Sequence, residues 1–271
     1  MSEGHFWPSP RPQRRGPSRA SGRHEDSAGI PFTGRRFHDN AGAGDDGTAP
    51  PRVLEAIRRF RMREVGAPEV VAAVHSARLL VPLVAVRGDE GVGARGRLVD
   101  KTQELSIVTV EGPDGRSVLP GFTSVAAMQA WDASARPIPI DAPRVALAAA
   151  SEGTPLIVID PGSATEFAVR RPALRPLATG EPWTPSFEDP DVLAAFQASA
   201  AGRDELLGVA VGAGDPDARL LGPELLVLLT LRPGLGEEEL AVLVGELQRR
   251  WSAHPVIAER VDSIGVRVQA G

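Results

Sequence analysis

Hydrophobic residues recur at helical spacing in several parts of the chain. One such helix is predicted from the spacing of Val53, Leu54, Ile57 and Phe60, and arginines occupy its other faces. Val125, Met128 and Trp131 repeat the pattern, and Thr123 or Ser124 precedes them as a candidate N-cap. The spacing predicts further helices over residues 68–75, 142–150, 190–201 and 237–251.

Between these segments, short aliphatic runs predict strands. The run from Leu79 to Val86 is typical of a buried strand, and Pro82 within it predicts an edge position or a bulge. The turn-forming stretch Gly112–Gly115 separates two runs and predicts a hairpin. The other predicted strands cover residues 105–110, 116–120, 138–140, 156–159, 167–169, 206–211, 225–231 and 264–268. Helices and strands alternate without a strict βαβ period, which predicts an α+β fold with mixed-sheet α/β layers.

The positions of the Pro- and Gly-rich stretches predict two domains preceded by a tail. Residues 1–49 are rich in Pro, Gly and Arg and poor in aliphatic residues, so we expect them to be disordered. Residues 50–180 form the first predicted domain. A linker with Gly180, Pro182, Pro185 and Pro190 opens the second predicted domain, residues 181–271, which we expect to contain a ββαβ core with helices on one face.

Composition narrows the class of protein. Hydrophobic residues make up 42% and charged residues 24%, which is typical of a globular protein, and the net charge of −5 gives no global attraction for nucleic acid or for a membrane. The absence of Cys excludes thiol nucleophiles, disulfides and Cys-based metal sites. The apolar runs are shorter than a bilayer requires, and the N-terminus lacks the apolar core of a signal peptide, so we expect a cytoplasmic location.

Several sequence blocks together resemble the SseB family, whose name refers to enhanced serine sensitivity. The blocks are Arg78–Leu83, Leu119–Ser124, Ala135–Pro139 and Leu156–Gly162, preceded by Asp45–Gly47, a lead-in common among actinobacterial members. The resemblance covers roughly residues 45–180, and the last 90 residues resemble the C-terminal domain of the family more loosely. It implies a cytoplasmic bacterial protein with two α/β-type domains and no agreed enzymatic activity or cofactor.

Four residues of these blocks form a candidate recognition surface. Phe122, Thr123 and Ser124 precede a predicted helix, where hydroxyl and backbone N–H groups bind anions. Asp160 ends a predicted strand, where ligands of open α/β sheets collect. The structural alternatives are that Thr123 or Ser124 caps the helix, that Phe122 fills the core, and that Asp160 binds its own backbone in a turn.

The sequence nominates no catalytic, cofactor-binding or metal-binding residue. The five His residues are scattered without metal-ligand spacing on a predicted element. Two stretches match G-x-G-x-x-G, one at Gly42 to Gly47 and one at Gly91 to Gly96, but neither lies between a strand and a helix as dinucleotide binding requires. We therefore expect no cofactor.

Three functions follow from these observations. The first is a non-catalytic protein-interaction or regulatory module with an unidentified protein partner. The second is an amino-acid-related small-molecule binding protein, or an enzyme linked to serine metabolism, as the family name suggests. The third is association with nucleic acid or the ribosome through the arginines between Arg11 and Arg23, which the acidic remainder of the chain disfavours.

Overall fold

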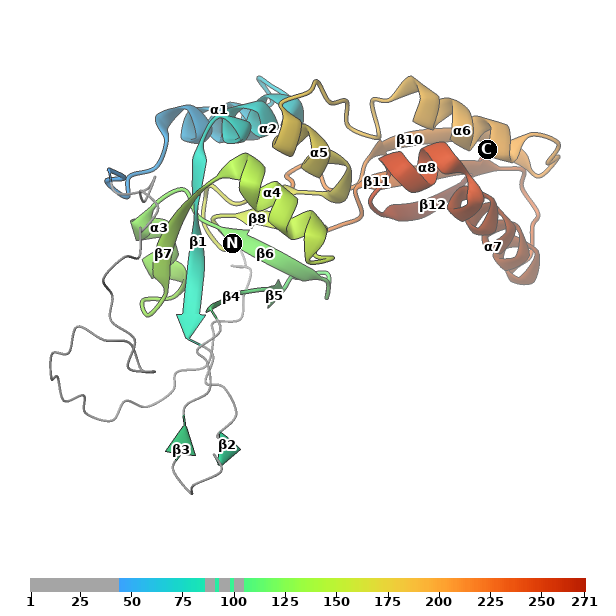
Figure 1. Cartoon of the computed structure of the whole chain (residues 1–271). Coiled ribbons are helices and arrows are strands. Elements are labelled where there is room, and N and C mark those ends of the chain that lie inside the picture. Colours follow the sequence, from blue (N-terminus) through green and yellow to red (C-terminus); the bar gives the residue numbers. More distant parts are fainter. Residues whose placement is uncertain (1–43, 86–90, 93–97, 100–104) are drawn as a thin grey trace, which may run out of the picture.

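The computed structural model describes residues 44–85, 91–92, 98–99 and 105–271 (Figure 1). The predicted tail and the G-x-G-x-x-G matches therefore lie largely outside the described residues. The end of the predicted tail nevertheless contacts the folded part. The Val125 amide donates to the Gly47 carbonyl at 2.9 Å, and Arg78 binds both the Thr48 carbonyl and the Asp45 carboxylate. Ordered structure thus begins before residue 50.

We call residues 45–179 the N-terminal unit. Its helices are α1 (Pro51–Arg61), α2 (Ala67–His75), α3 (Val125–Trp131), α4 (Ala142–Ser151) and α5 (Arg171–Thr179). Its strands are β1 (Arg78–Ala85), β2 (Gly91–Val92), β3 (Leu98–Val99), β4 (Leu105–Ile107), β5 (Val110–Glu111), β6 (Ser117–Gly121), β7 (Arg136–Asp141), β8 (Ile157–Ile159) and β9 (Phe167–Val169). The mixture of parallel and antiparallel strands with segregated helices is the predicted α+β fold.

Two sheets of the N-terminal unit meet at a single bridge. One has the order β4-β1-β7 and the other the order β5-β6-β8-β9, in which β6 and β8 are parallel. Leu80 and Phe122 exchange both backbone hydrogen bonds, at 2.8 and 2.9 Å, and so join β1 to the end of β6. Helices α1, α2, α4 and α5 bury one continuous core against β1, β6, β8 and β9, and α3 covers Leu80 and Phe122 in a smaller cluster.

The prolines of β1 and β7 fit an unbroken ladder. Leu80 directs its backbone groups to Phe122, away from β7, so its partner Pro139 occupies a non-hydrogen-bonded position of the β1–β7 pair. Backbone groups alternate along a strand, so the pair of Pro82 and Pro137 is also non-hydrogen-bonded. The prediction of a bulge at Pro82 is wrong, because the pairing of β1 with β7 continues through Pro82. Strand β1 lies between β4 and β7, but its pairing with β4 begins at Leu83, so within the described residues Pro82 has no paired strand on that side.

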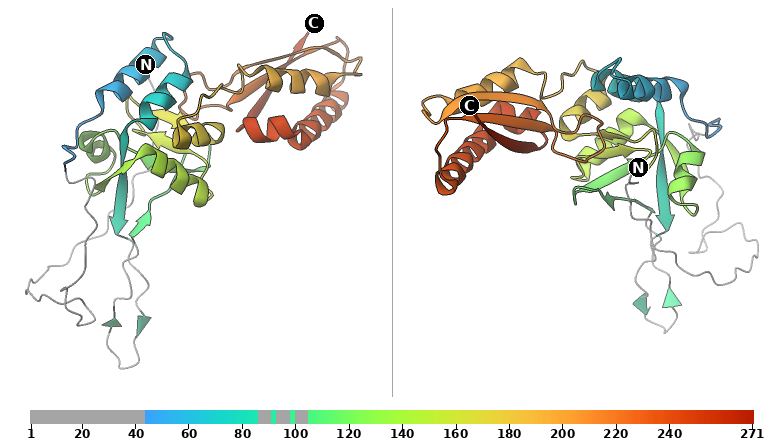
Figure 2. Two further views of the ribbon diagram at one scale, coloured as in Figure 1. Left: turned by 45° about the horizontal axis from the view of Figure 1, so that its top comes forward. Right: turned by 180° about the vertical axis from the view of Figure 1, so that it is seen from behind.

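We call residues 190–271 the C-terminal unit. It contains α6 (Pro190–Ala200), β10 (Leu206–Ala213), β11 (Leu225–Leu231), α7 (Glu237–Ala253), α8 (Pro255–Arg260) and β12 (Ile264–Ala270). The sheet order is β10-β11-β12, with β11 antiparallel to β10 and parallel to β12. Figure 2 shows this unit beside the N-terminal unit, to which it is joined by the chain between α5 and α6.

All three helices of the C-terminal unit bury one face of its sheet. Along β11 every second side chain is buried, from Leu225 to Leu231, and these residues share one core with Phe196, Leu247 and Trp251. The opposite side, which we call the outer sheet face, carries Gly208, Ala210, Gly212, Leu226, Leu228, Thr230, Gly265, Arg267 and Gln269. The Gln269 side-chain amide donates to Thr230 Oγ1 at 3.0 Å, as expected for neighbours on this face.

The pattern-based predictions recover most elements and miss two helices. The hairpin at Gly112–Gly115 is confirmed by the pairing of Val110 with Val118, but the run 105–110 divides between β4 on β1 and β5 on β6. Helices α5 and α8 were not predicted from the pattern. Each is short and begins with proline in its first turn, and α5 contains a second proline, Pro176, on its buried side.

Candidate functional site

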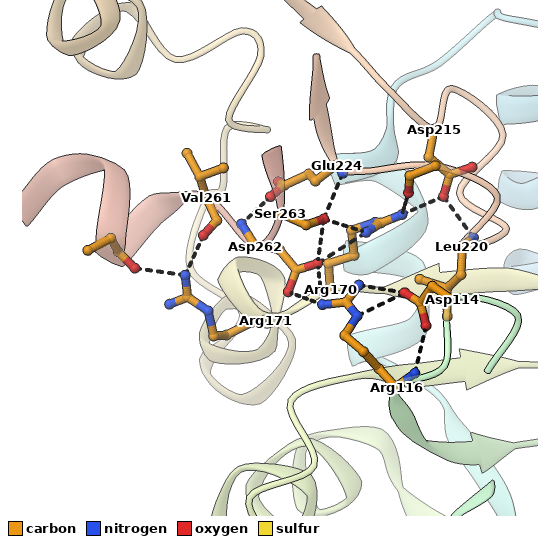
Figure 3. A network of polar contacts seen from close by, with 12 residues as sticks. Asp114, Arg116, Arg170, Arg171, Asp215, Leu220, Glu224, Val261, Asp262 and Ser263 are labelled. Atoms are coloured by element: carbon orange, nitrogen blue, oxygen red, sulfur yellow. Dashed lines mark hydrogen bonds and ion pairs between the residues drawn. The ribbon is translucent and has the colours of Figure 1, made fainter. Parts of the chain in front are cut away.

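A buried cluster of charges joins the two units. Arg170 follows β9 and flanks α5, and its side chain is 7% exposed. Its guanidinium contacts Asp215 at 2.7 Å and Asp262 at 3.1 Å, two carboxylates of the C-terminal unit (Figure 3). It also donates to the Gly222 carbonyl at 2.8 Å. We call this set, together with Arg116 and Asp114, the junction cluster.

Arg116 completes the junction cluster from the β5–β6 hairpin. Its guanidinium binds both oxygens of Asp262, at 2.9 and 3.0 Å, and Asp114 at 2.8 Å (Figure 3). Asp262 is 2% exposed, and its carboxylate contacts the guanidinium groups of both Arg116 and Arg170. A buried carboxylate is costly unless it is paired and hydrogen-bonded, so the cluster is stable only when the units meet in this arrangement.

Other arginines of the N-terminal unit bind backbone carbonyls of the C-terminal unit. Arg171 donates to Ala258, Glu259 and Val261 at the end of α8, where helix carbonyls lack internal partners. Arg63, just after α1, donates to the Pro216 carbonyl at 2.6 Å and to the Asp217 carboxylate at 2.8 Å. The two units are therefore oriented by directional polar contacts.

The loop between β10 and β11 adds an apolar contact between the units. Leu220 of this loop is 2% exposed and packs with Val118, Val158 and Ala168 of the N-terminal unit. The Ala168 amide donates to the Ala218 carbonyl at 2.7 Å, so the loop extends the edge at β9. Asp215 holds the loop by accepting from the Leu220 amide at 2.8 Å.

A cavity of about 550 Å³, which we call the junction cavity, lies beside the junction cluster. Its volume lies within the usual range of small-molecule sites. Its apolar wall includes the aromatic residues Phe60, Phe167, Trp183 and Phe187. Its charged lining residues are Arg63, Glu64, Glu69, Arg170, Glu188, Asp215 and Glu224. The wall therefore combines residues of α1, α2 and β9, the chain before α6, and the β10–β11 loop.

In addition to Asp215, Glu224 is a buried acid of the junction cavity. Its side chain accepts from the Asp262 amide at 2.5 Å, and its own amide donates to Ser263 Oγ at 2.9 Å. Burial raises the pKa of the Glu224 carboxyl, and the bond from Asp262 opposes this shift only in part. A cation that entered the cavity would favour the ionised form of this carboxyl.

The predicted recognition residues come together inside the fold. Asp160 accepts from the Thr123 amide, from Thr123 Oγ1 and from Thr165 Oγ1, each at 2.7 Å. Phe122, Thr123 and Asp160 are at most 2% exposed, so these three do not form a surface that a partner can reach. Asp160 ties the end of β6 to the turn after β8, and its side chain binds these groups instead of its own backbone.

The structural alternatives hold for Ser124 and Phe122. Ser124 is the N-cap of α3, and its Oγ accepts from the Ala127 amide at 3.1 Å. Phe122 is fully buried beside Met128, with its ring centroid 5.3 Å from that of Trp131. The sequence blocks around residues 119–124 and 156–162 are thus adjacent in space, because β6 and β8 pair in parallel.

No metal-binding group is present among the described residues. His75 Nδ1 donates to the Leu177 carbonyl at 2.8 Å and so connects α2 to α5, while His254 lies at the junction of α7 and α8. The other three His residues lie outside the described ranges. Within these ranges, no three His, Asp or Glu side chains are placed to hold a metal ion, and no helix has the length and apolar composition for crossing a bilayer.

The fold and the junction cluster define a protein of two α+β units that are oriented by buried arginine–carboxylate contacts. Residues 52–176 match the family model described as the SseB protein N-terminal domain. Residues 52–176 therefore form a domain of the SseB family. The match ends before α6, so the likeness of residues 181–271 to the C-terminal domain of the family stays a prediction. No curated protein and no solved structure matches the chain.

The residues of the junction were not identified from the sequence. Arg170 and Arg171 form a pair of cations directly after a buried strand, which is a signal of an interaction at that strand end. Their partners Asp215 and Asp262 lie 45 and 92 residues further on, so only the folded chain reveals the cluster.

We expect Arg170→Met to lower the free energy of unfolding by roughly 3–5 kcal/mol, because it leaves Asp215 buried without its cation. Arg175→Met on the adjacent helix α5 is the matched control, since the Arg175–Glu181 pair is 77% and 52% exposed and such pairs contribute about 0–1 kcal/mol. Urea denaturation followed by tryptophan fluorescence measures both. Equal losses for the two variants would contradict a structural role of the junction cluster.

Asp160 gives a second prediction, on pH dependence. Burial raises the pKa of the Asp160 carboxyl above its ordinary value of 3.8, so the folded protein retains this proton when the unfolded chain has released it. The contribution of Asp160 to stability is therefore full below pH 3.8 and decreases as pH rises through the folded pKa. The stability of Asp160→Asn relative to the parent should increase over that window in urea denaturation at stepped pH. If the stability of Asp160→Asn relative to the parent fell as pH rose, folding would lower the pKa of Asp160 and the prediction would be wrong.

Proposed function

We propose that the protein is a non-catalytic, cytoplasmic member of the SseB family that acts as a protein-interaction or regulatory module. The observation that supports this proposal is the outer sheet face. The solvated face of such a sheet is normally polar. Here Leu226 and Leu228 are half-buried on the central strand, and β10 beside them contributes only glycine and alanine, while the polar residues of this face, Thr230, Arg267 and Gln269, lie at the end of β11 and on β12. Apolar surface of this kind marks interaction sites.

The burial and mutual pairing of the charged side chains also favour a non-catalytic role. A catalytic acid, base or nucleophile needs access to a substrate and a pKa matched to its task. At the junction, Arg170, Asp215 and Asp262 are at most 7% exposed and are bound to one another. Asp160 is surrounded by Thr123 and Thr165 in the same way. These groups hold the scaffold together.

We expect Leu228→Glu to abolish the interaction with the protein partner, because it places a charge at the centre of the outer sheet face. The control is Leu147→Glu on α4, whose side chain is 61% exposed and lies in the other unit. Tagged chains are compared by quantitative co-purification from the native cell, with thermal unfolding as a check of folding. Undiminished recovery of a stoichiometric partner by Leu228→Glu, or a chain without any partner, would refute the proposal.

A second candidate function is small-molecule binding, which the junction cavity favours. The ligand would be an amino-acid-related compound, and the same cavity would be the site of an enzyme linked to serine metabolism. The supporting observation is a cavity of ligand size with aromatic walls and several polar groups at the boundary of two units.

A thermal-shift screen with amino acids and amines tests this second candidate. A ligand at 100 times its dissociation constant should stabilise the fold by about 2.7 kcal/mol. Trp183→Ala should remove the shift, because Trp183 lines the cavity, whereas Leu147→Ala should retain it. A screen in which the parent chain shows no shift with any of these compounds would refute the second candidate.

A further inference from the structure

The charges around the junction cavity are unequal. The lining contains two arginines and five carboxylates. Both arginines are already paired, because Arg63 binds Asp217 at 2.8 Å and Arg170 binds Asp215 at 2.7 Å. The partner of Arg63, Asp217, lies outside the lining, and so does Asp262, the second partner of Arg170. With two arginines and five carboxylates, the lining itself carries more negative than positive charge.

The acids of the lining differ in how far they are neutralised. Glu64 pairs with Arg59 at 3.2 Å, and Glu69 accepts from the Gly66 amide at the start of α2. Within the described part of the chain, neither Glu188 nor Glu224 forms an ion pair. Glu188 is exposed, and Glu224 is only 6% exposed. Glu188 is therefore available to a ligand of opposite charge, and Glu224 adds a carboxylate without an ion-pair partner to the buried part of the wall.

The aromatic wall is suited to the same kind of ligand. Aromatic faces attract cations, tryptophan most strongly. The guanidinium groups of Arg61 and Arg63 already lie over the Phe60 ring, at 5.6 and 5.7 Å from its centroid. Trp183 and Phe187 lie on the chain segment that carries Glu188, and both are half-buried. A cation therefore finds aromatic faces and a carboxylate on one short segment.

We propose that the junction cavity binds a small organic cation, an amine with an apolar body. The apolar body contacts Phe167, Val169 and Trp183, and the ammonium group lies toward Glu188 and Glu224. The carboxylates neutralise the ammonium group, and the aromatic rings exclude water around it. This inference rests on the second candidate function, that the junction cavity is a binding site.

The test compares three probes of one shape on the full chain by isothermal titration calorimetry. Phenethylamine is the cation, N-acetylphenethylamine is neutral and 3-phenylpropionate is the anion. We expect the amine to bind at least ten-fold more tightly than the neutral probe, and the anion to bind most weakly. Glu188→Gln should weaken the amine roughly three- to ten-fold and leave the neutral probe unchanged, since one charge pair near the surface is worth about 1 kcal/mol.

Two control variants make the outcomes distinct. Glu152→Gln removes an exposed carboxylate outside the cavity and should change no affinity. Trp183→Ala should weaken both the amine and the neutral probe, because it removes a contact with their shared apolar body, and should weaken the amine more, because it also removes an aromatic face that attracts the cation. Equal binding of the three probes by the parent chain would overturn the cation inference and retain the cavity as a site. Binding of none of them, together with a negative metabolite screen, would overturn the site as well.

Discussion

The arrangement of the two units depends on the burial of Arg170. This side chain is placed by the N-terminal core, because it directly follows β9 and flanks α5. Its carboxylate partners come from the turn after β10 and the residue pair before β12. The free-energy cost of removing these charges from water offsets most of their mutual attraction, so such a cluster adds little net stability. Removal of one member nevertheless destabilises the fold, because it leaves the others as unpaired buried charges. The cluster therefore specifies orientation more than it adds stability.

The junction cavity follows from the same kind of contact. Arginines that reach backbone carbonyls, such as Arg63 and Arg171, fix two surfaces at a distance set by their side chains. Two cores that packed on each other directly would fill the space between them. Here, within the described residues, the C-terminal unit reaches the apolar clusters of the N-terminal unit through its β10–β11 loop, where Leu220 joins one cluster and Ala218 packs against another. The aromatic residues on both sides of the junction consequently retain a common open space.

The sequence predicted the elements whose hydrophobic pattern is local and regular. Alternating burial along β11 and helical spacing in α1 arise because one face of each element packs on a core. Each pattern can be recognised within a short stretch of sequence. Helix α5 was not predicted, because prolines such as Pro172 and Pro176 usually interrupt a helical pattern, although both fit a helix that begins at Arg171 and is held by tertiary packing.

The candidate site was less predictable for a related reason. The sequence identified Thr123 and Asp160 as notable, and they do meet, but their burial depends on how α3 and the turn after β8 close over them. The junction cluster joins residues from the β5–β6 turn, the position after β9, the β10–β11 loop and the residue pair before β12, and no spacing rule links these segments. Charge pairing across units follows from the fold and cannot be read from local pattern.

The composite origin of the junction cavity has a thermodynamic consequence. Its wall is shared by α1, α2 and β9 on one side and by the β10–β11 loop on the other. A molecule that contacts both sides binds the present arrangement of the units more tightly than any arrangement in which they separate. Linkage then requires that occupancy of the cavity stabilise the junction cluster, and that an intact cluster raise the affinity of the cavity. Buried Arg170 and the cavity beside it are thus energetically coupled, and a partner on the outer sheet face would be sensitive to this coupling only if it distinguished the two arrangements.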